Sequence, residues 1–130
     1  MISNINFAGG EPVLYPGLME LVDYAYSLGF ALSVISNDSL LLNEHSCARR
    51  LFQQLTTLGI SVDSVNPNTL HVLGCCHCHE NVLTQEKLMR LLQIARHENP
   101  RLMIKLNTVV TRFNVGERLV ALENILPIQR

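Results

Sequence analysis

Four short apolar runs along the chain have the pattern of buried β-strands. They lie at residues 5–7, 31–35, 60–65 and 102–110. Apolar side chains occupy most positions in these runs rather than alternate ones, which is typical of parallel strands that are covered by helices. Loop-forming residues follow three of the runs, at Gly9-Gly10, Ser36-Asn37-Asp38 and Asn66-Pro67-Asn68.

Longer amphipathic segments alternate with these strands. Apolar residues recur at helical spacing over residues 17–28, 43–58, 85–99 and 114–126. The residues expected to end these four helices are Gly29, Gly59, Pro100 and Pro127. Thr84 is expected to be the N-cap of the third helix, and residues 70–79 are assigned to a loop.

The element order is four β–α units in one domain, residues 1–130, and two architectures fit it: a doubly wound sheet and part of a (β/α) barrel. Within 102–110, Lys105 and Asn107 share one strand face, while Ile104 and Leu106 share the other. A doubly wound sheet would bury Lys105 under helices, at a large desolvation cost. In a barrel, the Lys105 side chain would instead face the lumen, so a partial barrel is favoured.

Composition limits the setting in which such a domain works. Hydrophobic residues make up 48% of the 130 residues, charged residues make up 16%, and the formal net charge is −1. A packed core is therefore expected, and a basic surface for nucleic acid is not. No apolar run reaches the roughly 20 residues of a membrane span, and the N-terminus lacks the pattern of a signal peptide. We expect a cytoplasmic protein with no membrane or nucleic-acid partner. Because free-standing domains usually carry about 25% charged residues, we also expect an interior part of a larger protein.

Polar residues gather where the predicted strands end. They are Glu11, Ser36, Asn37, Ser61, Asp63, Asn107 and Thr111. The carboxyl ends of parallel strands meet at one edge, where (β/α) proteins bind ligands. The alternative is that polar residues simply border loops, but Ser61, Asp63 and Lys105 lie inside apolar runs, which favours a site.

Cysteine and histidine cluster in the predicted loop, at His71, Cys75, Cys76, His77, Cys78 and His79. Neighbouring cysteines cannot link distant segments, so a disulfide framework is not expected. One hypothesis is a zinc site at Cys75, Cys76 and Cys78, but the spacing lacks the C-x₂-C of typical zinc sites. The cluster is also compatible with thiols that have no function, and with a redox or interface role. Cys47, alone on a helix, is expected to be structural.

Four motifs on consecutive predicted strands resemble those of radical S-adenosylmethionine (SAM) enzymes, and of the viperin-like group in particular. The segments are Phe7–Pro12, similar to the GGEP motif, Val34–Asn37, similar to SNG, Ile60–Ser64, and Lys105–Asn114, similar to KiN-x-V-x-x-RFN. The resemblance implies units two to five of a six-unit partial barrel. It also implies SAM and a 4Fe–4S cluster as cofactors of the full-length protein.

The resemblance also implies roles for single residues. The residues implied in SAM binding are Gly9, Gly10, Glu11, Ser36, Asn37, Ser61, Asn107, Val109 and Thr111. Those implied in holding a nucleoside triphosphate are Lys105, Asn107 and Arg112. The C-x₃-C-x₂-C loop that binds the cluster precedes GGEP in the family and is absent from this sequence. No cluster is therefore expected in the chain itself. Gly74-Cys75 stands where viperin-like sequences have Gly-Arg, and cysteine cannot supply a bidentate cation.

The activity implied is that of a lyase in antiviral defence, which dehydrates a nucleoside triphosphate by radical chemistry with the help of a reductase. The fragment alone is expected to be inactive, and to form homo-oligomers through exposed sheet edges or its lumen face. Two different functions stay open besides this one. The first is a radical SAM enzyme with another substrate, such as a peptide or a molybdopterin precursor. The second is a non-catalytic α/β binding or interaction module.

Overall fold

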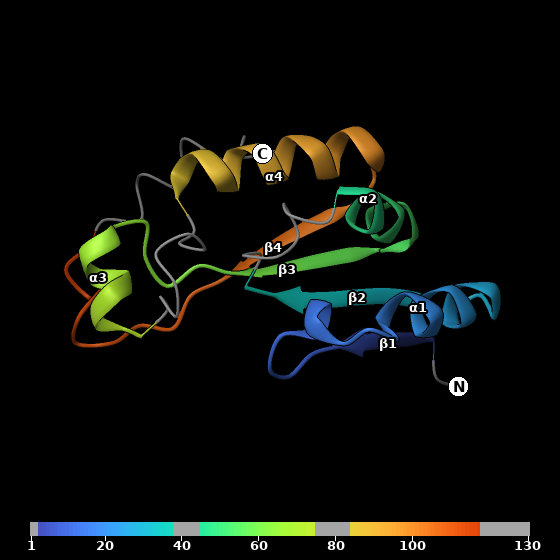
Figure 1. Ribbon diagram of the computed structural model, residues 1–130, viewed down its shortest axis with the longest axis horizontal. Helices are drawn as coiled ribbons and strands as arrows, with labels where there is room; N and C mark the ends of the chain where they lie inside the picture. The colour runs from blue at the N-terminus through green and yellow to red at the C-terminus, as the bar shows by residue number, and fades with distance from the viewer. Residues whose placement is uncertain (1–2, 38–44, 75–83, 118–130) are drawn as a thin grey trace.

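The structure, a computed structural model, describes residues 3–37, 45–74 and 84–117. Within these ranges the strands are β1 (Asn4–Phe7), β2 (Ala31–Ser36), β3 (Thr57–Ser61) and β4 (Met103–Asn107). They form one parallel sheet in the order β1-β2-β3-β4. Figure 1 shows their carboxyl ends pointing the same way.

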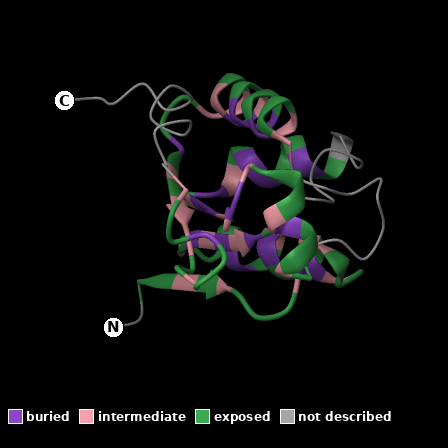
Figure 2. Cartoon of the chain, turned by 90° about the vertical axis from the view of Figure 1, so that its left-hand side faces the viewer, coloured by how far each residue is buried: buried purple, intermediate pink, exposed green. Residues whose placement is uncertain are grey.

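This strand order decides between the two architectures. Parallel β–α–β connections are right-handed, so a sheet in which each strand lies beside the preceding one has its helices on one face. Figure 2 shows the helices on one side of the sheet. A doubly wound sheet reverses its strand order and covers both faces. The described part of the chain is therefore singly wound, as in a barrel wall, and the predicted α/β class is confirmed.

The helix layer consists of α1 (Leu18–Ser27), α2 (His45–Gln54) and α4 (Gln85–Glu98), with α2 in contact with both others. Its inward side chains and one face of the strands form the core. The largest fully buried residues are Val22, Leu32, Val34, Leu51, Phe52, Leu58, Ile60, Val62, Leu88 and Leu91. None of the described helices is long and apolar enough to cross a bilayer.

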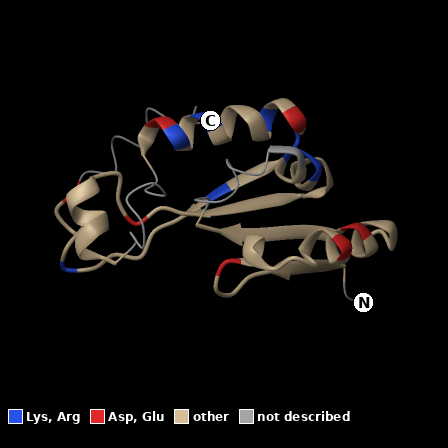
Figure 3. Ribbon diagram, viewed as in Figure 1, with Lys and Arg blue, Asp and Glu red and all other residues tan. Residues whose placement is uncertain are grey.

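The other face of the sheet is open and polar. The strand register pairs residues of this face, including Asn6 with Ser33, Gly59 with Lys105 and Ser61 with Asn107. Ile104 and Leu106 pack against the core, whereas Lys105 is exposed. The alternation predicted for β4 is confirmed. Lys105 is also the one charged residue in the four described strands, and most charged positions lie on helices and connections (Figure 3).

Two predicted helices are confirmed together with their end signals. Gly29, directly after α1 and Leu28, has a φ of +82° that favours glycine. Thr84 is the N-cap of α4, and its hydroxyl accepts a hydrogen bond from the Lys87 amide at 3.2 Å.

The boundary between α2 and β3 differs from the prediction. The sequence pattern extends the helix to residue 58 and begins the strand at residue 60, but α2 ends at Gln54 and β3 begins at Thr57. The Asn99 side chain, which comes from the end of α4, donates at 3.0 Å to the carbonyl groups of Phe52 and Leu55. It thus satisfies carbonyl groups where the helix ends. Gly59 is therefore a strand residue and not a helix stop.

Three further element boundaries were predicted from the sequence. The fourth strand ends at Asn107 rather than at residue 110. Part of the predicted loop is helical, because α3 (Pro67–Val72) begins with proline in its first turn and Asn66 as its N-cap. The predicted helix 114–126 begins with turns up to residue 117, and the rest lies outside the described residues.

Candidate functional site

The turn after β1 carries the two glycines of the GGEP motif. Gly9 and Gly10 have φ values of +93° and +51°, in the left-handed region that side chains disfavour. A Cβ atom built on either residue would have no atom within 4 Å beyond the glycine itself and its two chain neighbours. Backbone conformation rather than crowding therefore requires glycine at these positions, and the turn stays open to a ligand.

Glu11 joins this turn to the end of β2. Its Oε1 accepts hydrogen bonds from the Ser36 hydroxyl at 2.7 Å and from the Val13 amide at 3.2 Å. Its Oε2 accepts from the Asn37 amide at 2.7 Å. Ser36 is only 1% exposed and lies on the helix-covered face, whereas Asn37 is exposed at the edge. The carboxylate thus holds two neighbouring strand ends together.

A second polar network holds the ends of β3 and β4. Beyond Asn107 the chain leaves the sheet ladder, and the Asp63 carboxylate accepts a hydrogen bond from the Val109 amide at 2.9 Å. The Thr108 hydroxyl donates to the Val62 carbonyl at 2.8 Å. Side chains that follow the two strands therefore continue the pairing of β3 and β4 after the regular ladder ends.

Asn114 lies at the centre of this network and is 7% exposed. Its side-chain amide donates at 2.8 Å to the carbonyl groups of Asp63 and Val109. Its side-chain oxygen accepts from the Thr111 amide at 2.6 Å and from the Thr111 hydroxyl at 3.3 Å. The sequence places Asn114 in the motif Lys105–Asn114 but does not predict these contacts, because Asp63 lies 51 positions earlier in the chain.

Glu117 was not singled out from the sequence. Its carboxylate accepts hydrogen bonds from the Ser64 hydroxyl at 2.5 Å and from the Thr69 hydroxyl. It links the segment after β4 to both the end of β3 and helix α3. No local pattern marks such a residue, since these partners lie 53 and 48 positions earlier in the chain.

The residues predicted to hold the nucleotide lie on β4 and in the turn that follows it. Lys105 and Asn107 are on the open face of β4, and Ser61 is the register partner of Asn107. Arg112 is exposed in the turn beyond the strand, where its guanidinium lies 4.7 Å from the ring centroid of Phe113.

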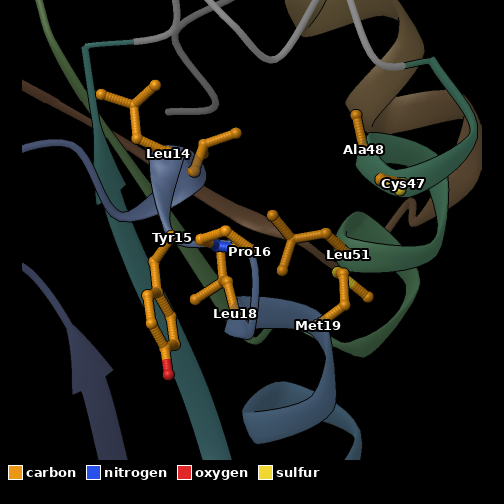
Figure 4. A pocket seen from close by; sticks show the side chains of 9 residues that line it. Leu14, Tyr15, Pro16, Leu18, Met19, Cys47, Ala48 and Leu51 are labelled. Carbon is orange, nitrogen blue, oxygen red and sulfur yellow. The ribbon is translucent and has the colours of Figure 1, made fainter.

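A separate cavity of about 350 Å³ lies on the helix side of the sheet (Figure 4). Apolar side chains from the 3-10 turn η1 (Pro12–Leu14) and from α1 and α2 line it, among them Leu14, Met19 and Leu51. Cys47 lies at its wall, and none of the predicted site residues does. The cavity is therefore distinct from the polar edge described above.

Within the described ranges, no group of three or more histidine, cysteine or acidic side chains could hold a metal ion. The candidate zinc ligands Cys75, Cys76 and Cys78 lie outside the described residues.

No family model matches the chain, but curated relatives do. An S-adenosylmethionine-dependent nucleotide dehydratase of Selenomonas ruminantium is 48% identical over 130 residues, which are all of this chain and 47% of that protein. A protein of the same description from Fibrobacter sp. (strain UWH6) is 33% identical over 117 residues, which cover 89% of this chain and 34% of that protein. The chain thus spans between a third and a half of the length of these curated relatives.

The solved structures add a match in fold. The crystal structure of archaeal TYW1 superposes with a TM-score of 0.56 at 21% identity, and the match covers 95% of this chain and 38% of that one. Together with the sequence relatives, it confirms the predicted likeness to viperin-like radical SAM enzymes and to part of their barrel.

Proposed function

Because this chain is a homologue of the S-adenosylmethionine-dependent nucleotide dehydratases, we propose that it forms a central part of such an enzyme. In this proposal the polar edge binds SAM, and the open face of the sheet binds a nucleoside triphosphate that is dehydrated. The observation that carries the proposal is Lys105, exposed on the otherwise uncharged open face, beside the edge that Glu11 and Asn114 organise.

The SAM half of the proposal rests on the shape and chemistry of the edge. The open turn at Gly9 and Gly10 leaves room for the methionine part of SAM, and the turn is held by Glu11. We assign SAM contacts to Gly9, Gly10, Glu11, Asn37, Ser61, Asn107, Val109 and Thr111. Ser36, which is buried, is assigned an indirect role through its hydrogen bond to Glu11. When bound, SAM and a 4Fe–4S cluster supply the radical that removes a hydrogen atom from the substrate. None of the described residues is assigned to the cluster.

The nucleotide half rests on charge. An ammonium group is a compact positive charge that suits phosphate oxygens, and Lys105 lies on the face away from the helices. Asn107, two residues further along the same face, offers an amide donor and acceptor for the sugar or phosphate. Arg112 adds a second exposed cation beyond the end of the strand. A reductase is the partner that this radical chemistry requires, and antiviral defence is the setting that we propose.

A second candidate function is a non-catalytic binding module. The observation that favours it is the Gly74-Cys75 pair, since cysteine lacks the fixed positive charge with which arginine clamps a carboxylate. The two candidates differ in whether the chain binds SAM and nucleotide.

The test compares Lys105→Ala with Arg101→Ala, which removes the same charge from an exposed residue at the opposite edge. Binding of SAM and of each ribonucleoside triphosphate is measured by equilibrium dialysis. Losing one charged hydrogen-bond partner costs about 1.5–3 kcal/mol, or about ten- to hundred-fold in affinity. We expect Lys105→Ala to lose this much nucleotide affinity with SAM binding nearly intact, and Arg101→Ala to lose neither. An equal loss of affinity for SAM and for nucleotide in Lys105→Ala would contradict the assignment. A wild-type chain that binds neither ligand would favour the second candidate, as a module for other partners.

A further inference from the structure

We infer that Asn114 is a positioning residue, which fixes the segment 109–112 against the end of β3 and so sets the shape of the ligand edge. The inference rests on the proposed function, because this segment carries three of the residues assigned there to ligands. They are Val109, Thr111 and Arg112.

Apolar packing holds the segment 109–112 only weakly. It leaves the sheet after Asn107, and its apolar side chains are not packed, since Val109 is 65% and Val110 is 69% exposed. Apolar burial, the main source of stability in the rest of the fold, therefore contributes little here. The position of the segment depends on polar contacts.

Asn114 makes the contacts that hold both ends of the segment. Its amide nitrogen donates to the carbonyl groups of Asp63 and Val109, each at 2.8 Å, so that one group ties the segment's first residue to the chain just after β3. Its oxygen accepts from the Thr111 amide and hydroxyl, which closes the turn. A carboxamide has two donor hydrogens and two acceptor lone pairs, and all four are used by a side chain that is almost completely buried.

Asp63 supports the same arrangement from the segment that follows β3. Its carboxylate accepts the Val109 amide at 2.9 Å while its backbone carbonyl accepts from Asn114. The amide groups of Val109 and Thr111 are therefore both engaged, and their exchange with solvent reports whether the network is intact.

The chain contains a matched control at the opposite edge of the sheet. Asn99 donates at 3.0 Å to the carbonyl groups of Phe52 and Leu55, and its oxygen accepts from the Arg101 amide at 3.1 Å. It is the same residue type in the same kind of role, because it also joins two elements by bonding backbone groups. Unlike Asn114, Asn99 lies before β4 begins, at the end of the strand away from the proposed ligand residues.

The experiment compares Asn114→Ala, Asn99→Ala and the wild-type chain. The free energy of unfolding is measured with urea, amide exchange by mass spectrometry, and binding of SAM and the ribonucleoside triphosphates by equilibrium dialysis. We expect both variants to be destabilised to a similar extent. Only Asn114→Ala should show faster exchange at Val109 and Thr111 and at least tenfold weaker binding, with Asn99→Ala within twofold of wild type.

A conservative variant covers the case in which Asn114→Ala does not fold. Asn114→Ser introduces no charge and keeps a hydroxyl that can donate to only one of the Asp63 and Val109 carbonyl groups, so we expect an intermediate loss of affinity. Wild-type affinity in the folded Asn114 variants, or an equal loss in Asn99→Ala, would overturn the positioning role alone. A wild-type chain that binds neither SAM nor nucleotide would overturn the proposed function and this inference with it.

Discussion

Replacing Glu11 with glutamine tests the polar network that joins β1 and β2. Glutamine has nearly the same size and shape, so packing is preserved and only the hydrogen-bond chemistry and the charge change. In the native chain one carboxylate oxygen accepts from Ser36 and Val13, and the other accepts from the Asn37 amide at 2.7 Å. A carboxamide has only one oxygen. In Glu11→Gln the side-chain NH₂ group must therefore face one of these hydrogen-bond donors and cannot accept from it.

The magnitude follows from the contacts that are lost. If the oxygen stays with Ser36 and Val13, the amino group meets the Asn37 amide, and one hydrogen bond to a charged group is lost. Such a bond contributes about 1.5–3 kcal/mol. Because Glu11 is only partly buried, solvent reduces the loss, and we expect Glu11→Gln to lower the free energy of unfolding by about 2 kcal/mol. Marginal stabilities of about 5–15 kcal/mol make this a large fraction of the total.

Urea unfolding followed by circular dichroism measures the change. With a slope of about 1–3 kcal/mol per molar urea, the midpoint should fall by about 1 M. Glu20→Gln is the charge-matched control, since Glu20 is exposed in the first turn of α1 and its carboxylate contributes only about 0.3–1 kcal/mol through the helix dipole. A loss below about 0.5 kcal/mol for Glu11→Gln, or an equal loss for Glu20→Gln, would refute the reasoning.

The sheet supplies two further predictions. Gly59→Ala should lower the free energy of unfolding by about 1–3 kcal/mol, because the new Cβ would lie 3.0 Å from the Ile35 side chain and 3.4 Å from the Asn107 amide. Gly116→Ala, with no atom within 4 Å of its Cβ, should leave the urea midpoint unchanged. The isolated chain should also self-associate, because β1 and β4 are edge strands of the described sheet and its open face is uncovered. Sedimentation equilibrium at micromolar concentration checks this, and a monomer at all concentrations would contradict it.

Local patterns were sufficient to predict much of the fold. Helices α1 and α4 have apolar residues at helical spacing, and their ends carry signals with a local cause, the positive φ after α1 and the Thr84 cap. The face of β4 that carries Lys105 was also predictable, because alternation along a strand needs no knowledge of its neighbours. What these features share is that the cause lies within a few residues of the effect.

The α2–β3 boundary shows where this reasoning fails. Leu51, Leu55 and Leu58 have the spacing of one helical face, and all three are buried. Leu58 is buried as part of a strand, however, and the helix ends where the Asn99 side chain bonds the Phe52 and Leu55 carbonyl groups. Asn99 lies 47 and 44 positions away from these two residues, so no local pattern could place the boundary.

The candidate site was predictable as a set of residues but not as a set of contacts. Motif positions such as Glu11, Ser36 and Asn107 were identified from the sequence. The bond between Glu11 and Ser36 spans 25 positions, and the bonds of Glu117 to Ser64 and Thr69 span 53 and 48. Only the strand order brings these side chains together, which is why Glu117 was missed.

The polar edge is held by two separate hydrogen-bond networks. Glu11 holds the ends of β1 and β2, whereas Asn114 and Asp63 hold those of β3 and β4. Within the described ranges, the hydrogen bonds of these three side chains involve no residue that belongs to both networks. Between them lies the junction of β2 and β3, where the backbone ladder from Ser33–Thr57 to Ser36–Ile60 supplies the pairing. Each half of the edge is therefore fixed by its own polar side chains, and the common sheet sets the distance between the halves. A ligand that spans the edge would meet two separately held surfaces, so a change in one network should weaken the contacts of its own half first.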